Sequence, residues 1–481
     1  MADQLKASAV ELLEKNGYKL NGLDSLRERG VEFCRCYTPH PLCVPARISL
    51  FTSQFPHTTG YRNNEKLMDG YLHHGCIDWK NAGYVTGLIG KNHCFEEKER
   101  NKYFDYCCEC SHGNYSPTKD KGMSWKVLER YNNDTPQGFS DIEICDTHKK
   151  GKIADFSKEY HSTEAIAEQS TYFIDSFGVK NPFVLWVSFP CPHEPYICVE
   201  EYYKKVQPLA EKLADCYEIP NKKYMPDRMK IIQEIFSIED KNDLKSVISS
   251  YYGNILHIDN AISTIIENLK KNELYDDTII VFCADHGDFA GQFGMAVKGG
   301  VFNDCLTRVP LIVNSYGLTK SKDKSLVNLI DILPTVFSLQ GLDIPITFRG
   351  RLLPSVTDAK PNDFTVSEYG SGAELLTLKE FYKLKKPYDY ITAFESIKWR
   401  ESEGRRKMIV YDKWKYVHDP MGDIDELYDL SNDVKEIHNL ANDESYISII
   451  NMMRLKLLDW AISQEDSHNF SKKKYELEPV R

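Results

Sequence analysis

Cys43-Val44-Pro45-Ala46-Arg47 is the stretch from which the rest of this sequence is interpreted. A cysteine two residues before a proline and four before an arginine is a short pattern that carries little weight alone. Here Leu50 and Thr52 follow it, and the run Pro56-His57-Thr58-Thr59-Gly60 comes next. Because proline is favoured in the first turn of a helix, we expect a helix to continue over residues 46–51. Cys43 would then lie at a helix N-terminus, where unpaired N–H groups and the helix dipole favour an anion.

Three further motifs each follow a short run that is predicted to be a strand. The predicted strands and the motifs after them are 83–89 with Gly90-Lys91-Asn92-His93, 183–189 with Pro192-His193-Glu194-Pro195, and 278–283 with Asp285-His286-Gly287 and the later Lys298. In open α/β sheets, functional residues lie just beyond the carboxyl ends of the strands. The spacing therefore predicts that these motifs meet at one edge of a sheet.

This ordered set of motifs resembles the type I sulfatases of the alkaline phosphatase superfamily, and the resemblance covers nearly the whole chain. It implies an α/β fold with a large mixed sheet flanked by helices. It also implies a smaller C-terminal α+β subdomain, with an antiparallel sheet and one packed helix. Because the texture of the sequence changes near residue 360, we expect a catalytic domain at 1–360 and the subdomain at 361–481.

Periodicity predicts the remaining elements. The expected helices are 5–13, 21–30, 162–177, 247–269, 326–339 and 446–462, and the expected further strands are 31–37, 310–313 and 414–418. The run 425–430 resembles part of the family's C-terminal subdomain. Residues 95–160 are predicted to be an insertion over the rim of the site, and residues 200–245 to be irregular and charged.

The resemblance implies that Cys43 is oxidised to formylglycine, and that the hydrate of this aldehyde is the nucleophile. One hydroxyl would attack sulfur, and the other would expel sulfate by re-forming the aldehyde. A thiolate is a poor alternative, because its adduct would be hard to release. A formylglycine-generating or radical SAM maturation enzyme is the implied partner. The alternative is an unmodified loop thiol.

A divalent metal is implied at the same place. By resemblance its ligands are Asp3, Gln4, Asp285 and His286, with the hydrated residue 43 completing the shell. Hard oxygen ligands suit Ca²⁺ or Mg²⁺, and the softer His286 also leaves Mn²⁺ open. The alternatives are a frayed chain end for Asp3 and Gln4, and a simple strand-end turn for Asp285 and His286.

The resemblance gives roles to the remaining charged residues. Arg47 would hold residue 43 and the metal-bound carboxylates, and Lys91 and Lys298 would contact sulfate oxygens. His93, two residues past Lys91, would face the same way in an extended segment, and is expected to deprotonate the second hydroxyl. His193 would contact sulfate and help protonate the leaving oxygen, alone or with Lys298.

Two departures from the family pattern stand out. Ser53 follows Thr52 where the family usually has glycine. Several apolar residues precede the acidic pair in the family, whereas the first strand is almost absent before Asp3. Either the start is internal to the true gene product or the strand is truncated.

Composition sets further limits. The chain has 481 residues, 14 cysteines and a formal net charge of -11. Acidity argues against nucleic acids and anionic membranes as partners, and no apolar run reaches the roughly 20 residues that span a bilayer. Without a signal peptide, and with thiols such as Cys34, Cys94, Cys191 and Cys283 expected to be reduced, a cytoplasmic location is predicted. Cys107-Cys108-Glu109-Cys110 lacks the second ligand pair of a zinc clip.

The predicted function is hydrolysis of sulfate monoesters of a sugar, an alkyl or an aryl alcohol. The substrate is expected to be small, possibly a sulfated saccharide. A phosphonate or phosphate ester hydrolase of the same superfamily is the first alternative. A noncatalytic carbohydrate-binding relative, in which Cys43 stays a thiol, is the second. Specificity is expected in residues 95–160, 195–245 and 365–400.

Overall fold

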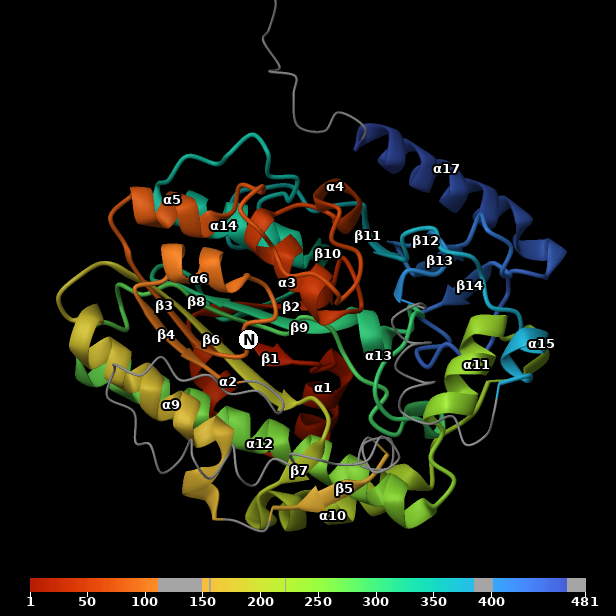
Figure 1. The fold of residues 1–481 in the computed structure, drawn as a ribbon, viewed down its shortest axis with the longest axis horizontal. Coiled ribbons are helices and arrows are strands. Elements are labelled where there is room, and N and C mark those ends of the chain that lie inside the picture. The colour runs from red at the N-terminus through yellow and green to blue at the C-terminus, as the bar shows by residue number, and fades with distance from the viewer. Residues whose placement is uncertain (111–148, 155–156, 221, 385–400, 465–481) are drawn as a thin grey trace, which may run out of the picture.

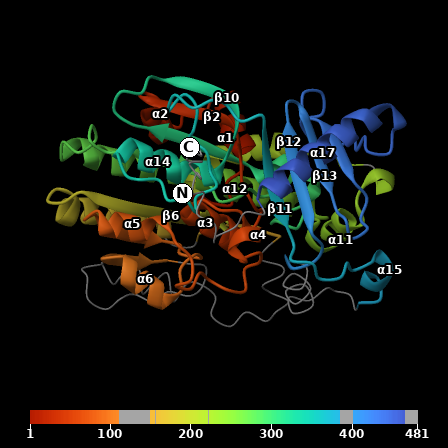
Figure 2. The ribbon, with the colours of Figure 1, turned by 90° about the horizontal axis from the view of Figure 1, so that it is seen from above.

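The computed structural model describes residues 1–481 except 111–148, 155–156, 221, 385–400 and 465–481. A mixed sheet lies at the centre, with helices on both of its faces (Figure 1). The C-terminal strands and the last helix form a separate layer at one side, as the second view confirms (Figure 2). The expected alkaline phosphatase-like α/β fold with a C-terminal antiparallel sheet is confirmed.

The central sheet is built from two four-stranded parts. The first is parallel, in the order β1 (Ala2–Asp3), β6 (Phe183–Pro192), β3 (Val85–Gly90) and β4 (Tyr106–Glu109). The second is mixed, in the order β10 (Ser321–Asn328), β2 (Gly30–Tyr37), β9 (Arg308–Asn314) and β8 (Ile280–Cys283). A parallel bridge between Ala2 and Ala284 joins the two parts. The very short β1 therefore sits at the middle of the combined sheet.

Helices cover both faces of this sheet (Figure 1). One face carries α1 (Ala7–Lys15), α2 (Asn21–Arg27), α9 (Ser162–Phe173) and α12 (Lys241–Lys271), and the other carries α3 (Cys43–Thr52), α5 (Gly75–Asn81), α6 (Glu97–Tyr103) and α14 (Ile332–Gln340). The shorter elements are α4 (Pro56–Thr59), α13 (Asp304–Thr307), α15 (Leu378–Phe381) and the two-stranded pair β5 (Gly151–Ile153) with β7 (Tyr196–Cys198). The 31-residue α12 forms because its apolar residues recur at helical spacing, so that they are buried along its whole length.

The C-terminal sheet is an antiparallel meander of β11 (Phe364–Tyr369), β12 (Arg406–Tyr411), β13 (Trp414–His418) and β14 (Glu426–Asp429). One face packs against α17 (Ile447–Ser463). Ile409 and Leu427 from the strands share a buried cluster with Met453 and Trp460 from the helix. A division of the chain at residue 360 stays a prediction.

The prediction of an irregular segment at 200–245 is wrong. The structure forms α10 (Glu200–Ala214) and α11 (Asp227–Phe236) there, and α12 begins at Lys241. Val206, Leu209 and Ala210 are buried on α10 at the spacing of three and four that brings side chains to one helix face. Charged residues around this narrow stripe, and Pro208 within the helix, obscure it in the sequence.

The helix predicted at 326–339 begins too early. β10 continues through Asn328, and a capping box between Asn328 and Asp331 starts the turn that leads into α14. The prediction of an insertion at 95–160 is wrong for its first part, because α6 and β4 form there and β4 pairs with β3 in the central sheet. Residues 111–148 and 155–156 lie outside the described residues, and so does the 385–400 part of the predicted specificity segment. Among the described residues, no helix is both long and apolar enough to cross a bilayer. Cys34, Cys94, Cys191 and Cys283 are free thiols.

Candidate active site

Two acidic residues meet at the centre of the sheet edge. Asp3 ends β1 and Asp285 follows β8, and the bridge between Ala2 and Ala284 holds these two strand ends side by side. Gln4 turns the chain with a φ of 64° and donates its backbone N–H to Asp285 Oδ1 at 3.0 Å. Asp3 and Gln4 are fully buried, so this end of the chain is not frayed.

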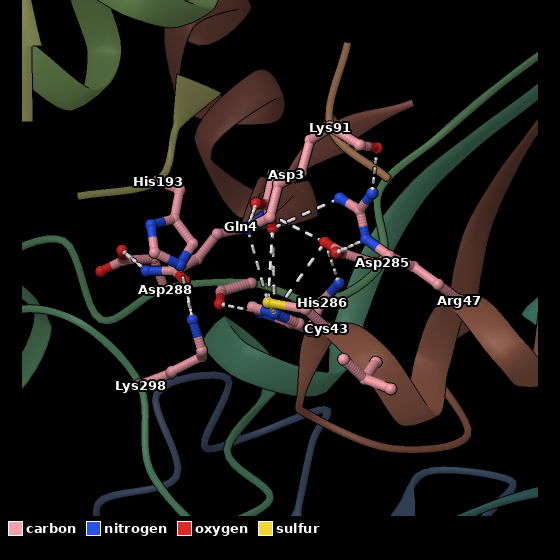
Figure 3. A network of polar contacts seen from close by, with 12 residues as sticks. Asp3, Gln4, Cys43, Arg47, Lys91, His193, Asp285, His286, Asp288 and Lys298 are labelled. Atoms are coloured by element: carbon pink, nitrogen blue, oxygen red, sulfur yellow. Dashed lines mark hydrogen bonds and ion pairs between the residues drawn. The ribbon is translucent and has the colours of Figure 1, made fainter. Parts of the chain in front are cut away.

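Cys43 lies beside these carboxylates at the start of α3, as Figure 3 shows. Asp3, Cys43, Asp285 and His286 are all buried, and one ligand atom from each lies within 4.8 Å of the others. The Cys43 Sγ is 3.1 Å from His286 Nε2 and 3.7 Å from Asp3 Oδ1. Among the described residues, these four form the one group of three or more His, Cys, Asp or Glu side chains arranged to hold a metal.

The donor set of this group fits a divalent cation. His286 Nδ1 donates to the Gly287 carbonyl at 2.9 Å, which leaves the lone pair of Nε2 facing Cys43. Burial lowers the pKa of His286, and the charge of Asp285 opposes this only in part. Two carboxylates and a neutral imidazole nitrogen therefore converge, a combination that binds divalent cations in proteins.

Arg47 links the cluster to the surrounding strands. Its side chain is 0% exposed, and Nε donates to Asp285 Oδ2 at 2.8 Å while Nη2 lies 3.6 Å from Asp3 Oδ1. Nη1 donates to the Lys91 carbonyl and to Ser188 Oγ, both at 2.9 Å. The guanidinium thus fixes three segments that approach the site from β3, β6 and β8.

Lys91 reaches the same point from the end of β3. Its ammonium forms an ion pair with Asp3 and lies 3.8 Å from Cys43 Sγ. Burial raises the pKa of the Cys43 thiol to about 11, and the charge of Asp3 adds to this while Lys298 and Lys91 oppose it. The unmodified thiol is therefore protonated near neutral pH.

A second group of polar side chains adjoins the first (Figure 3). Lys298 Nζ donates to His193 Nε2 at 2.9 Å and also to the side-chain oxygen of Gln4. The Gln4 amide nitrogen donates to Glu194 Oε2 at 2.7 Å and to Asp288. Both ends of the Gln4 amide thus have protein partners, and its assignment as a metal ligand stays a prediction.

Asp288 is a site residue that sequence reasoning missed. It is buried, and it accepts hydrogen bonds from Tyr196 Oη at 2.8 Å and from the Ala290 N–H at 2.6 Å. Burial raises its pKa to about 6, and the nearby charge of Glu194 adds to the effect. Its place three residues after Asp285, in the same loop, was the available signal.

His93 does not follow the geometry from which its role was argued. Its φ is 40°, so the segment is not extended at residue 93. The prediction that His93 and Lys91 face the same way required an extended segment. The backbone instead places Lys91 in the cluster, with the Lys91 N–H donating to the Ser188 carbonyl at 2.8 Å. The assignment of His93 as a base stays a prediction.

A residue from the C-terminal part supports the helix that carries Cys43. Asn64 Oδ1 accepts a hydrogen bond from the Val44 N–H at 3.0 Å, and thereby satisfies a first-turn donor of α3. Glu401 accepts from the backbone N–H of Asn64 at 2.8 Å and from its side-chain amide at 2.9 Å. Neither Glu401 nor this contact was predicted.

The other end of α3 accounts for Ser53. This residue is the C-cap with a φ of 51°, a conformation that favours glycine. Its hydroxyl donates to the Ile330 carbonyl at 2.8 Å and accepts from the Gly350 N–H at 3.0 Å. These bonds stabilise a serine at the position where the sequence departs from the family pattern.

Comparisons with known proteins agree with this geometry. The family described as Sulfatase matches residues 1–342. A choline-sulfatase of Rhizobium meliloti is 25% identical in an alignment of 416 residues that covers 81% of this chain and 77% of the relative. An arylsulfatase of Clostridium perfringens is 25% identical in an alignment of 410 residues that covers 78% of this chain and 81% of the relative. The solved phosphonate monoester hydrolase SpPMH of Silicibacter pomeroyi has a TM-score of 0.75 over 97% of this chain and 95% of its own, and at 19% identity this is a likeness of fold.

Proposed function

This chain belongs to the sulfatase family and hydrolyses sulfuric esters, and from that premise we propose that residue 43, oxidised from cysteine to formylglycine, is its nucleophile. The observation that carries the proposal is the position of Cys43, 2% exposed, between two carboxylates and the ammonium groups of its surroundings. A formylglycine there would supply an aldehyde hydrate, an oxygen nucleophile whose return to the aldehyde releases the sulfate. The raised pKa of the thiol supports this choice, because a protonated thiol is a weak nucleophile.

Asp3, Asp285, His286 and residue 43 are the side chains that we propose to hold a divalent cation. Ca²⁺ is the first choice, with Mg²⁺ and Mn²⁺ as alternatives, because carboxylate oxygens dominate the donor set. When bound, the cation would polarise a sulfate oxygen and lower the pKa of a hydroxyl beside it. Arg47 donates to Asp285 Oδ2 and lies 3.6 Å from Asp3 Oδ1, and so helps to keep both carboxylates oriented toward the cluster.

We propose that Lys91 and Lys298 contact the sulfate oxygens of the substrate. Lys91 is buried next to Cys43, and Lys298 approaches from the other side together with His193. Fixed positive charges in a buried site stabilise negative charge that grows in the transition state, because little solvent screens them. The pair of lysines would thus hold the sulfate group on both sides of the nucleophile.

We propose that Lys298 donates the proton to the leaving alcohol oxygen. His193 Nδ1 donates to the Glu194 carbonyl at 2.6 Å, so Nε2 accepts the hydrogen bond from Lys298. Burial lowers the pKa of Lys298, but the neighbouring negative charges, those of Glu194, Asp3 and Asp285 among them, outweigh this and raise it above its ordinary value. The lysine therefore carries the proton, and His193 orients it toward the leaving oxygen.

The proposed substrate is a small sulfate monoester of a sugar, an alkyl or an aryl alcohol. The proposed partner is a maturation enzyme that oxidises Cys43, of the formylglycine-generating or radical SAM type. A phosphonate or phosphate ester is the alternative substrate.

The test joins mass analysis of residue 43 with a substrate panel. Protein made with a maturation enzyme is expected to carry an aldehyde at position 43, and to cleave an aryl sulfate faster than the aryl phosphonate or phosphate. Cys43→Ala should abolish this turnover, while Cys34→Ala, a free thiol on β2, should retain it. A thiol that persists with full activity would contradict the nucleophile. Faster cleavage of the phosphorus esters would favour the alternative substrate.

A further inference from the structure

The loop that carries Lys298 packs against the C-terminal part of the chain. Lys298 extends toward His193 in the active site (Figure 3), and Gly300 follows it by two residues. Arg228 of α11 and Arg406 of β12, called the arginine pair below, both reach Gly300. These contacts come from outside the site described above, so they call for an explanation of their own.

Arg406 donates a hydrogen bond to the backbone of this loop. Its Nη1 donates to the Gly300 carbonyl at 3.1 Å, while Nε donates to Asp419 at 2.7 Å and Nη2 to Asp423 at 3.2 Å. The side chains of Arg406 and of both acids are at most 8% exposed. Because hydrogen bonds to two carboxylates hold the planar guanidinium, the bond to the Gly300 carbonyl fixes the loop relative to the C-terminal sheet.

Arg228 packs directly on the same glycine. Its Nη1 donates to Glu403 Oε2 at 2.6 Å, and both side chains are 2% exposed. The guanidinium also lies over the Tyr369 ring of β11, 4.7 Å from the ring centroid. A β-carbon at Gly300 would lie less than 3.0 Å from the Arg228 guanidinium and from the Tyr369 ring, closer than real β-carbons come. The loop therefore needs glycine at this point for close approach.

The two arginines are joined to each other through Asp423. This carboxylate accepts from the backbone N–H groups of Asp227 and Arg228, at 3.1 and 3.2 Å, and so satisfies donors in the first turn of α11. It also accepts from Arg406 Nη2. α11 and the C-terminal sheet therefore meet the Lys298 loop as one connected unit.

These contacts hold the backbone on both sides of Lys298. Before it, the Val297 N–H donates to Tyr196 Oη at 2.8 Å, and after it the arginine pair holds Gly300. A lysine ammonium sits on a flexible four-carbon stem, so its place depends on where the backbone below it is held. The bond of 2.9 Å from Lys298 Nζ to His193 Nε2 requires such a fixed base. Misplacing a reacting group by about 1 Å can cost about 10²-fold in rate.

We propose that Arg228 and Arg406 are positioning residues for Lys298. By fixing Gly300, they keep the lysine ammonium beside His193 and directed at the leaving oxygen of the sulfate ester. This inference rests on the proposed function, in which Lys298 donates the proton to that oxygen. It gives α11 and the C-terminal sheet a part in the reaction, which they exert through the backbone of one loop.

Gly300→Ala tests the proposal, because it presses one methyl group against Arg228 and Tyr369 and leaves every charge in place. In matured enzyme with saturating Ca²⁺, kcat for an alkyl sulfate should fall by about 10–10²-fold, and kcat for nitrophenyl sulfate should fall much less. The matched control is Gly75→Ala, whose β-carbon would press on Leu333 in the core between α5 and α14. It should leave the ratio of the two kcat values unchanged. A wild-type ratio in Gly300→Ala, or the same change in the control, would overturn the proposal.

A conservative variant tests the arginine itself. Arg406→Lys keeps a positive charge between Asp419 and Asp423, but a single ammonium cannot keep the three separate bonds that include the Gly300 carbonyl. Folded Arg406→Lys is expected to show a lower ratio of alkyl to nitrophenyl kcat than the wild type. A wild-type ratio would contradict the role of Arg406.

A double-mutant cycle separates this inference from the role of Lys298. If Gly300 acts through Lys298, adding Gly300→Ala to Lys298→Met should change kcat no further than about twofold. Losses that multiply would overturn the inference, whether Lys298 supplies a proton or only a charge. If Lys298→Met slows both substrates equally, the proposed proton donor fails, and the cycle still decides whether the loop acts through Lys298.

Discussion

Replacing Arg47 by methionine should lower the free energy of unfolding more than the same replacement at an exposed arginine. The guanidinium is fully buried, and it compensates the carboxylates of Asp285 and Asp3. Its loss removes the arginine partner of Asp285 and leaves Asp3 paired with the ammonium of Lys91. It also removes the donors to the carbonyl of Lys91 and the hydroxyl of Ser188. Removing one partner of a buried ion pair costs about 3–5 kcal/mol, because the remaining charge stays desolvated.

This cost converts into a measurable shift. At roughly 2.1 cal/mol/K per residue, the 481 residues of the chain give an unfolding entropy of about 1.0 kcal/mol/K. A loss of about 3–5 kcal/mol in the free energy of unfolding should therefore lower the melting temperature, measured in the presence of a chelator, by about 3–5 °C. A saturating divalent cation should reduce this loss, since it would itself compensate the two carboxylates.

Differential scanning calorimetry of the wild type and of the variants tests this expectation. The control is Arg454→Met, because Arg454 is 47% exposed and pairs with Asp425 at the surface, where such pairs contribute about 0–1 kcal/mol. If Arg47→Met lowers the melting temperature no more than this control, the guanidinium does not compensate the buried acids. A double variant with Asp285→Asn should lose less than the sum of the single variants, because the charge that needs compensation is then absent.

Three other predictions follow from the described contacts. Removing divalent cations with EDTA should abolish turnover and lower the melting temperature, and Ca²⁺ should restore both. The melting temperature of Asp285→Asn should not change on addition of Ca²⁺. If EDTA changes neither turnover nor the melting temperature of the wild type, the proposed cation site is refuted. Lys298→Met should lower kcat for alkyl sulfates by roughly 10²–10⁴-fold and kcat for nitrophenyl sulfate much less, because nitrophenol leaves without needing a proton. An equal loss of kcat on both substrates would exclude Lys298 as the proton donor. Burial raises the pKa of Glu426 from 4.5 to about 7, so its contribution to stability is complete below the unfolded pKa and is lost as pH rises through about 7. Glu426→Gln should therefore reduce the fall in unfolding free energy between pH 4.5 and 8 by about 3 kcal/mol, and a wild-type profile in the variant would contradict the raised pKa.

The parts of the site that follow strands were predictable from local sequence. Lys91, His193 and Asp285 each come directly after a short apolar run, and the carboxyl ends of neighbouring strands necessarily meet. The helix after Cys43 was predictable from Pro45. For these residues, a family pattern and the physical rule for open sheets gave the same positions.

Contacts that depend on tertiary structure were not predictable. Asn64 and Glu401 are 337 residues apart, and nothing in either neighbourhood indicates their pairing. The direction of the Gln4 side chain depends on Lys298 and Glu194, which approach from two other loops. The turn at His93 requires a positive φ that a histidine rarely adopts, so an extended segment was the natural expectation.

The chain of hydrogen bonds from Glu401 through Asn64 to Val44 affects how this protein can be recombined with its relatives. A chimera that exchanges the C-terminal third for that of another protein would replace the carboxylate that steadies the first turn of α3. Such a hybrid could inherit every residue around Cys43 and still hold that turn less firmly. Engineers who graft new rims onto this scaffold should therefore transplant Asn64 and Glu401 as a matched pair.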